Sequence, residues 1–303
     1  MAQSPGPIRG NEKSLAWRIL DESKGNSNGA ISLVNAIATW KGATLGITSK
    51  VEAIVSATEG KGIHLELDNQ NASSRLVNKV VEFAVPKKEL EKNKIEISLK
   101  SEIPTGYGLK SSSAISSVIS LACHKLFKPN YTDSQVLNAG IDASLATKVS
   151  MTGAYDDACA CYFGGIQVTD NKARKTIKSD KTPTNLVAVV FVPKSRKRGN
   201  IKHLKILDTV FDRAWNFAKN GDYWNAMTLN GYATSAVLNS DPKIISSLIE
   251  NGALGASVSG NGPSIAAIVK KDNASKIKKV FSEHEGTIML AEINNKRAEV
   301  HEL

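Results

Sequence analysis

A glycine-rich segment that leads directly into a helix is the feature that most constrains how this chain can fold. The segment is PTGYGLKSSSA, spanning Pro104–Ala114. Its glycines, Gly106 and Gly108, let the backbone bend tightly and approach a ligand closely. The serines at 111–113 open the expected helix, whose N-terminus offers free N–H groups and a partial positive charge. Together these features predict a phosphate-binding turn ahead of a buried helix.

Two familiar phosphate-binding motifs do not fit this segment. A Walker loop needs Gly-Lys-Ser or Gly-Lys-Thr, but Leu109 stands between Gly108 and Lys110. A Rossmann fingerprint needs a third glycine at the position of Ser111. The alternative to a phosphate site is an ordinary strand-to-helix turn with a serine cap.

Cysteine content and hydropathy indicate the cellular compartment in which we expect the protein. Only three cysteines occur among 303 residues, too few for a disulfide framework, which favours a reducing, cytoplasmic location. No apolar run reaches the roughly 18 residues that cross a membrane, and the first residues lack the apolar stretch of a signal peptide. We therefore expect a cytoplasmic protein without a membrane partner.

The formal net charge of +10 allows two kinds of partner, nucleic acid or small anionic substrates. Much of the positive charge lies in residues 172–205, which include KSRKR at 194–198. Aromatic residues make up only 6% of the chain and do not interleave with these charges, which argues against stacking on nucleic-acid bases. We expect a solvated basic loop and no nucleic-acid partner.

The predicted elements divide the chain into three parts. Residues 1–28, rich in Gly, Pro, Ser and Asn, are expected to form an N-terminal arm. Residues 29–170 indicate a strand-rich unit with buried helices, and residues 171–303 a mixed α+β unit. The expected helices cover 30–40, 73–85, 111–128, 204–219, 222–238 and 273–285, with two more beginning at Thr132 and at Asp241-Pro242. The expected strands cover 46–57, 63–67, 95–99, 166–169, 186–192 and 287–293, with two more flanking the turn near 260, and residues 151–158 are expected to form a loop.

Three segments together resemble the motifs of the GHMP kinase superfamily, which includes galactokinases, homoserine kinases, mevalonate kinases and phosphomevalonate kinases. The segment at 104–114 matches the pattern P-x-x-x-G-L-x-S-S-x-A of the ATP-binding motif, with Lys110 where a glycine is usual. GASVSGNGPS at 255–264 resembles the third motif, and GAISLVNAIATWKGA at 29–43 stands where the first is expected. All three occur in the expected order.

The particular residues in these motifs point to one family within the superfamily. GLKSSSA, TGAYDDACA and VNAIATWKGATLGI are similar to the archaeal-type shikimate kinase family, over about residues 28–295. This resemblance implies that ATP and shikimate give shikimate 3-phosphate and ADP, a step of chorismate and aromatic amino-acid biosynthesis. The nearest alternative is another kinase of the superfamily, acting on homoserine or mevalonate. A nucleic-acid-binding protein is a distant alternative.

The resemblance also implies a fold. We expect an α+β, two-domain GHMP kinase fold. Residues 29–170 would form the ATP-binding N-terminal domain, a two-layer α/β unit with a left-handed βαβ crossover. Residues 171–303 would form a ferredoxin-like C-terminal domain. ATP and the acceptor would lie in the cleft between the domains.

Finally, the resemblance implies a role for individual residues, with ATP and Mg²⁺ as cofactors. Asp156 aligns with the aspartate that lies near the acceptor hydroxyl in mevalonate kinases, where it could accept the hydroxyl proton. Asp157 is expected to be structural, and the alternative for both is capping of backbone N–H groups. Lys110 is expected to touch a phosphate or the substrate carboxylate unless it is a solvated lysine. The resemblance implies that Ser113, or Ser112, helps to hold Mg²⁺. The superfamily usually has a glutamate ligand on the helix before the catalytic aspartate, and the nearest acid to that position here is Asp142, which we therefore also expect to bind Mg²⁺. The residues expected to wrap the ATP phosphates are Pro104, Thr105, Gly106, Tyr107, Gly108, Leu109, Lys110, Ser111, Ser112, Ser113 and Ala114. The turn expected to approach them from the other domain consists of Ser259, Gly260, Asn261 and Gly262.

Overall fold

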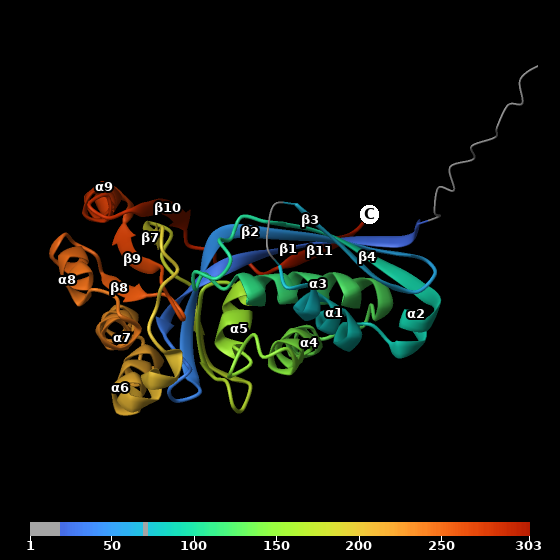
Figure 1. The fold of residues 1–303 in the computed structure, drawn as a ribbon, viewed down its shortest axis with the longest axis horizontal. Coiled ribbons are helices and arrows are strands. Elements are labelled where there is room, and N and C mark those ends of the chain that lie inside the picture. Colours follow the sequence, from blue (N-terminus) through green and yellow to red (C-terminus); the bar gives the residue numbers. More distant parts are fainter. Residues whose placement is uncertain (1–18, 69–71) are drawn as a thin grey trace, which may run out of the picture.

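The computed structural model describes residues 19–68 and 72–303, which form two units side by side (Figure 1). The sheet of the first unit contains β1 (Ile19–Val34), β2 (Lys41–Glu59), β3 (Gly62–Asp68), β4 (Asn93–Ser101), β5 (Ile166–Asp170), β6 (Lys175–Asp180) and β11 (Glu299–Glu302). Its main order is β11-β1-β2-β4-β3, while β5 pairs with β2 and β6 with β5. In β2, Val51, Ala53 and Val55 are fully buried and the residues at 52 and 54 only partly, so one face points to the core, as period-two alternation predicts.

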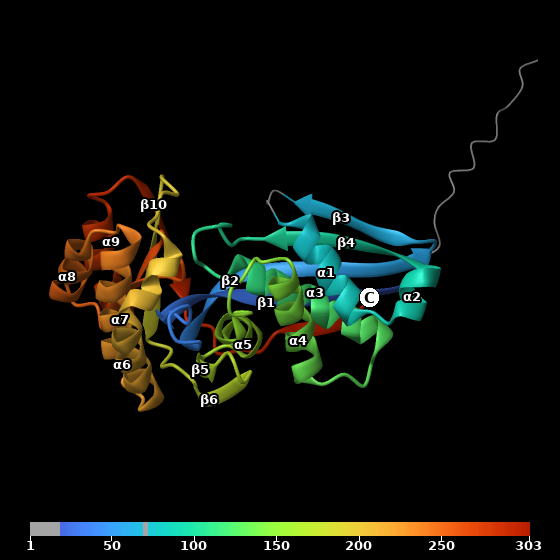
Figure 2. The same ribbon diagram turned by 60° about the horizontal axis from the view of Figure 1, so that its bottom comes forward.

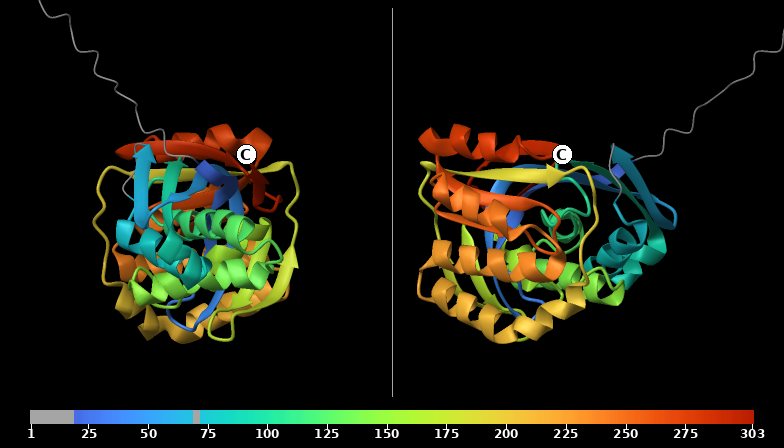
Figure 3. Two further views of the ribbon diagram at one scale, coloured as in Figure 1. Left: turned by 90° about the vertical axis from the view of Figure 1, so that its right-hand side faces the viewer. Right: turned by 60° about the vertical axis from the view of Figure 1, so that its left-hand side comes forward.

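One layer of helices covers one face of this sheet (Figure 1; Figure 3, left). The helices are α1 (Ser74–Ala84), α2 (Lys87–Lys92), α3 (Ser111–Phe127), α4 (Asp133–Ala146) and α5 (Tyr155–Phe163). Helix α3 is central, and Ala114, Val118, Ile119 and Ala122 along it are fully buried. Its N-terminus is therefore held rigidly at the edge that faces the second unit.

The connection from β3 to β4 is the predicted βαβ crossover. The two strands are parallel neighbours, and α1 and α2 join them. In Figure 2 the helices lie in front of the sheet, both strands point to the left and β4 lies below β3. The crossover is therefore left-handed, against the usual preference for right-handed connections.

The second unit is ferredoxin-like, as predicted. Its antiparallel strands β7 (Leu186–Pro193), β8 (Gly255–Val258), β9 (Ile265–Lys270) and β10 (Gly286–Glu292) are arranged in the order β10-β7-β9-β8. Its helices are α6 (Asp208–Lys219), α7 (Tyr223–Leu238), α8 (Pro242–Glu250) and α9 (Ala274–Phe281), with short 3₁₀ turns η1 (Ile201–Leu207) and η2 (Lys271–Asn273). Figure 3 (right) shows this unit, coloured yellow to red, beside the first. Among the described residues, no helix is long and apolar enough to cross a membrane.

The start of the chain differs from the sequence-based expectation. Residues 1–18 of the expected arm lie outside the described residues, but residues 19–34 form β1 instead of the end of an arm followed by a helix from residue 30. Ala30, Ile31, Leu33 and Val34 are all fully buried. A strand that is buried on both faces has consecutive apolar residues, and this pattern imitates a helix.

Two strands that follow residue 170 in the sequence pair with strands of the first unit. Strand β6 pairs with β5 and β11 pairs with β1, so residues 175–180 and 299–302 belong to the first sheet. Strand β6 reads KTIKSD and is largely exposed, so no apolar alternation marks it. The expected loop at 151–158 is shorter than predicted, because α5 begins at Tyr155.

The capping box predicted for α4 offers a test of local stability. The Thr132 hydroxyl accepts a hydrogen bond from the Gln135 backbone N–H, and the Gln135 side chain accepts one from the Thr132 N–H. We predict that Thr132→Ala lowers the free energy of unfolding by about 1 kcal/mol. The control Thr132→Ser retains the hydroxyl and should stay close to the parent. Denaturant unfolding of the three proteins measures the difference, and equal midpoints for alanine and serine would contradict it.

Candidate active site

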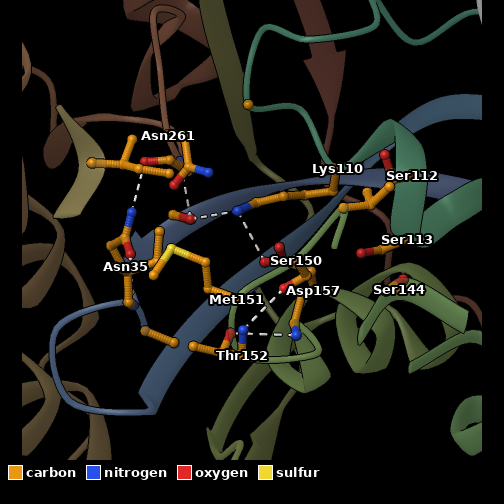
Figure 4. Close-up of a pocket in the computed structure, with 18 of the residues that line it drawn as sticks. Asn35, Lys110, Ser112, Ser113, Ser144, Ser150, Met151, Thr152, Asp157 and Asn261 are labelled. Carbon is orange, nitrogen blue, oxygen red and sulfur yellow. Dashed lines mark hydrogen bonds and ion pairs between the residues drawn. The ribbon is translucent and has the colours of Figure 1, made fainter. Parts of the chain in front are cut away.

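A cavity of about 390 Å³ is lined by residues from both units (Figure 4). The first unit contributes Gly106 and residues 108–113 of the glycine-rich segment, the end of β1 and the start of α5. The second unit contributes Gly260 and Asn261 together with Arg198 and Ile201. A cleft between two rigid units, lined by polar and charged groups, is a common setting for small-ligand binding.

The glycine-rich segment presents the N-terminus of α3 to this cavity. Gly106 and Gly108 have φ values of 85° and 84°, in the region that favours glycine. Ser111, Ser112 and Ser113 form the first turn of α3 and line the cavity. Because the first N–H groups of a helix have no partner within it, this turn can donate hydrogen bonds to an anion in the cavity.

The third-motif turn lies directly against the glycine-rich segment. The Ser259 hydroxyl donates to the Gly108 carbonyl at 2.8 Å, and the Ser264 N–H donates to the Tyr107 carbonyl at 3.2 Å. A Cβ on Gly108 would lie 2.0 Å from the Ser259 carbonyl oxygen, so only glycine fits there. Asn35, just after β1, also binds the third-motif turn, because its side-chain amide donates to the Gly260 carbonyl at 2.8 Å.

Lys110 is a buried, paired lysine rather than a solvated one. Its side chain is only 7% exposed, and its Nζ lies 2.9 Å from Asp157 Oδ1 and 2.7 Å from the Ser32 hydroxyl (Figure 4). Its φ of 66° lies in the left-handed region, which glycine adopts without strain and a lysine adopts only at a cost. The lysine thus places a positive charge at the cavity wall, beside the start of α3.

Asp156 lies deeper than its neighbour. It is 3% exposed, and its Oδ1 accepts from Asn171 Nδ2 at 2.7 Å, while Thr44 Oγ1 lies 3.1 Å from its Oδ2. The Asn171 side chain in turn accepts from the Asp156 backbone N–H at 3.1 Å. A Cβ on Gly42 would lie 2.3 Å from Asp156 Oδ2, so the absence of a side chain at Gly42 makes room for this carboxyl.

The surroundings of Asp156 alter its acidity. Burial raises the pKa of the Asp156 carboxyl to about 6, and the negative charge of Asp157 contributes to the rise. Lys110, Asn171 and Thr44 act in the opposite direction and lower this pKa. A carboxyl with a pKa near 6 can both hold and release a proton close to neutral pH.

Asp157 is the more accessible carboxylate of the pair. Its side chain is 16% exposed and lines the cavity, where its Oδ1 lies 3.1 Å from Thr44 Oγ1 in addition to its ion pair with Lys110. Both aspartates belong to the first turn of α5, at the favourable end of that helix dipole. The structure therefore brings Lys110, Asp156 and Asp157 together at one place.

Asp142 is not part of this arrangement, so the expectation that it holds Mg²⁺ is not supported. Its carboxylate pairs with Arg174 at 2.5 Å and is not among the residues that line the cavity. The reason is that Asp142 lies on a side of α4 that turns away from the cavity. Pro104, Thr105, Tyr107 and Ala114 also lie outside the lining; of these, Thr105 holds the Ser111 hydroxyl at 3.2 Å.

Several lining residues escaped the sequence analysis. Ser144, Ser150 and Met151 line the cavity (Figure 4), as does Lys148, which precedes Thr152 of the TGAYDDACA segment. The basic run was expected to be a solvated loop, yet Arg198 from it reaches the cavity. A lysine-rich or arginine-rich run is a weak signal by itself, because it does not say which of its members turns inward.

The hydroxyl groups of Ser112 and Ser113 fit Mg²⁺, which prefers oxygen ligands and commonly keeps phosphate oxygens and water around it. Across residues 19–68 and 72–303, no group of three or more His, Cys, Asp or Glu side chains could hold a metal ion.

The close approach at Gly108 generates a prediction with a matched control. Gly108→Ala adds a Cβ against the Ser259 carbonyl, whereas Gly62→Ala, also at positive φ (107°), places its Cβ in open space. We predict that Gly108→Ala destabilises the protein by about 1–3 kcal/mol more than Gly62→Ala, because overlap adds to backbone strain. Denaturant unfolding checks the stabilities, and equal losses for the two variants would show that the two turns are not in tight contact.

Comparison with known proteins shows which family the chain belongs to. The GHMP kinases N terminal domain model matches residues 75–165, and the GHMP kinases C terminal model matches residues 227–285. The chain is 34% identical to the shikimate kinase of Methanosarcina acetivorans, covering 89% of this chain and 93% of that protein. It is 36% identical to the shikimate kinase of Pyrococcus furiosus, covering 86% and 95%.

Solved structures agree on the fold. Homoserine kinase from Cytophaga hutchinsonii superposes with a TM-score of 0.72 at 17% identity, covering 95% of this chain and all of that one. Mevalonate kinase from L. major, in complex with R-mevalonate, gives a TM-score of 0.69 at 15% identity, covering 92% and 98%. The chain belongs to the GHMP kinase family, in the group that contains the archaeal shikimate kinases.

Proposed function

We propose that this chain transfers the γ-phosphoryl group of ATP to a hydroxyl of shikimate, giving shikimate 3-phosphate and ADP. The observation that supports this most directly is the placement of the Lys110–Asp157 ion pair beside the N-terminus of α3, in one cavity. Phosphoryl transfer requires mainly positioning and neutralisation of charge, and these groups supply both. The likeness to shikimate kinases over most of the chain supports shikimate as the acceptor.

The glycine-rich segment and α3 would bind the ATP phosphates. Free N–H groups at Ser111, Ser112 and Ser113 face the cavity, and the partial positive charge of the helix end favours anions. The hydroxyl groups of Ser112 and Ser113 would hold Mg²⁺, which when bound offsets the negative charge of the phosphates. The Gly260–Asn261 part of the third-motif turn would close the phosphate site from the second unit.

The acceptor would bind next to the two aspartates. Both aspartates line the cavity, and Asp157 is the more exposed of the two, so we assign it the contact with the acceptor hydroxyl. Asp156, the residue expected from the sequence to take the proton, is more deeply buried and would act together with it. Lys148 and Arg198 add positive charge to the cavity wall and would attract the shikimate carboxylate or the phosphates.

Homoserine and mevalonate kinases are related in fold, but identities of 15–17% carry no information on the acceptor. We propose a cytoplasmic enzyme without a nucleic-acid or membrane partner. The three cysteines are free and buried, which agrees with a reducing compartment. The positive charge is accounted for by anionic substrates.

An assay of ADP release over a panel of acceptors tests the proposal. With ATP and Mg²⁺, we predict that kcat/KM for shikimate exceeds that for homoserine, mevalonate and galactose by at least about 100-fold, since a site built for one set of hydroxyls rejects others strongly. Phosphorus NMR should identify the product as shikimate 3-phosphate. Preference for another acceptor would overturn the substrate, and no ADP release with any acceptor would overturn the kinase assignment.

Replacing the aspartates one at a time tests their roles. We predict that Asp156→Asn and Asp157→Asn each lower kcat by about 100-fold or more, as expected when a proton acceptor is removed. Asp142→Asn is the matched control, because Asp142 pairs with Arg174 outside the cavity, and its kcat and Mg²⁺ dependence should stay near the parent values. Circular dichroism would establish that all three variants fold. Near-parent kcat in both Asp156→Asn and Asp157→Asn would remove the pair from the chemistry.

A further inference from the structure

Thr44 is the side chain on which both aspartates converge. It is fully buried on β2, and its Oγ1 lies 3.1 Å from Asp156 Oδ2 and 3.1 Å from Asp157 Oδ1. A threonine hydroxyl has one proton to donate, whereas an ionised carboxylate can only accept. If both carboxyls are ionised, Thr44 can therefore satisfy only one of them, and the other contact joins two acceptors.

Both contacts become hydrogen bonds when one extra proton is present. A protonated carboxyl then donates to Thr44 Oγ1, and Thr44 donates to the other carboxylate. The Lys110 Nζ lies 2.9 Å from Asp157 Oδ1, so the positive charge is paired with Asp157. The extra proton therefore belongs on Asp156, whose burial disfavours its charged form.

The surrounding hydrogen bonds leave the right atom of Asp156 available. Asn171 Oδ1 accepts from the Thr169 hydroxyl at 2.7 Å and from the Asp156 N–H at 3.1 Å, so its amide nitrogen is turned toward Asp156. That nitrogen donates to Asp156 Oδ1 at 2.7 Å. Since Oδ1 is already occupied by a donor, Oδ2, which faces Thr44, is the oxygen left to hold a proton.

We propose that Thr44 is a positioning residue that passes a proton from Asp157 to Asp156, so that Asp156 is the final site of the proton released by the acceptor hydroxyl. This inference rests on the proposed function. As the acceptor oxygen bonds to the γ-phosphorus, the bond from that phosphorus to the leaving oxygen of ADP breaks. The acceptor O–H bond also breaks, and its proton moves to Asp157 Oδ1. That proton then bonds to Thr44 Oγ1 while the original Thr44 proton moves to Asp156 Oδ2, which leaves Asp157 ionised beside Lys110.

The charged neighbours of Asp156 are few. Among the described residues, those whose charge or acidity acts on it are Asp157, Lys110, Cys159 and Cys161. Burial raises the pKa of the Cys159 thiol to about 12 and that of Cys161 well above its ordinary value, so both are neutral near pH 7. The protonation of Asp156 therefore responds mainly to Asp157 and Lys110.

The pH dependence of kcat distinguishes this relay from a purely structural role of Thr44. Burial raises the pKa of Asp156 to about 6. Above that pH, Asp156 Oδ2 carries no proton and can accept one, whereas below it Oδ2 is already protonated. In the parent enzyme we expect kcat for shikimate to fall as pH falls through about 6. In Thr44→Val, which keeps the shape but lacks the hydroxyl, we expect kcat at pH 7.5 to be about tenfold lower and the step near pH 6 to be lost. KM for shikimate should stay within about twofold.

Two further variants serve as controls. Thr44→Ser retains the hydroxyl and should recover both kcat and the step near pH 6. Thr58→Val makes the same change at another buried threonine of β2 and should leave the pH profile unchanged. A Thr44→Val enzyme that retains the parent kcat and the step near pH 6 would overturn the relay, while shikimate turnover by the parent would leave the proposed function intact.

A measurement without substrate completes the test. In protein with ¹³C-labelled aspartate carboxyl groups, we expect Asp156 to titrate near pH 6 by NMR in the parent and at a higher pH in Thr44→Val, because the Thr44 hydroxyl lowers the pKa of Asp156. The Asp157 carboxyl carbon should respond to that step in the parent and lose most of the response in Thr44→Val. An unchanged response in Thr44→Val would overturn the relay, and this result is obtained even if shikimate proves not to be the acceptor.

Discussion

A buried ion pair between Lys110 and Asp157 connects the phosphate turn to the start of α5. Bringing two charges out of water costs free energy that their attraction often does not recover, so a buried pair is weak evidence for stability. Here the pair lies on the wall of the cavity, and Lys110 also donates to Ser32 at the end of β1. The interaction therefore fixes three segments of the first unit around the place where phosphate and acceptor would meet.

The second unit completes the site through Arg198 on the cavity wall and through hydrogen bonds to backbone carbonyl groups. The Ser259 hydroxyl and the Ser264 N–H reach carbonyl groups of the phosphate turn, and Gly108 has no space for a side chain. Hydrogen bonds from Asn35 to Gly260 and to Asn230 attach the end of β1 to the same unit. Because two rigid sheets meet at one turn, the cavity has a defined shape before any ligand arrives, which reduces the entropy that binding must overcome.

Local signals in the sequence were enough to predict much of this arrangement. The glycine-rich turn, the capping box at Thr132 and the Asp241-Pro242 helix start all form as expected, because each depends on neighbouring residues alone. The failures concern tertiary context. Burial of β1 on both faces made a strand resemble a helix, and the polar, largely exposed sequence of β6 concealed another strand. Asp142 pairs with Arg174 away from the cavity, and Thr44 on β2 meets the aspartates of α5 across more than a hundred residues of sequence, so neither outcome could be predicted from neighbouring residues.

Backbone strain is a further feature that the site has at the expense of stability. Lys110 and Ala154, the residues immediately before α3 and α5, both adopt the left-handed conformation, with φ of 66° and 52°. For residues with a side chain this conformation costs about 1–2 kcal/mol each. Such strain persists only where the surrounding structure enforces it, and it gathers at functional sites. Each strained residue turns the chain so that a helix begins at the cavity, with the serines on one helix and the aspartates on the other. The strain at Lys110 and Ala154, the buried ion pair and the crowded Gly108 occur together at this cavity, which is what a site selected for positioning, rather than for stability, would require.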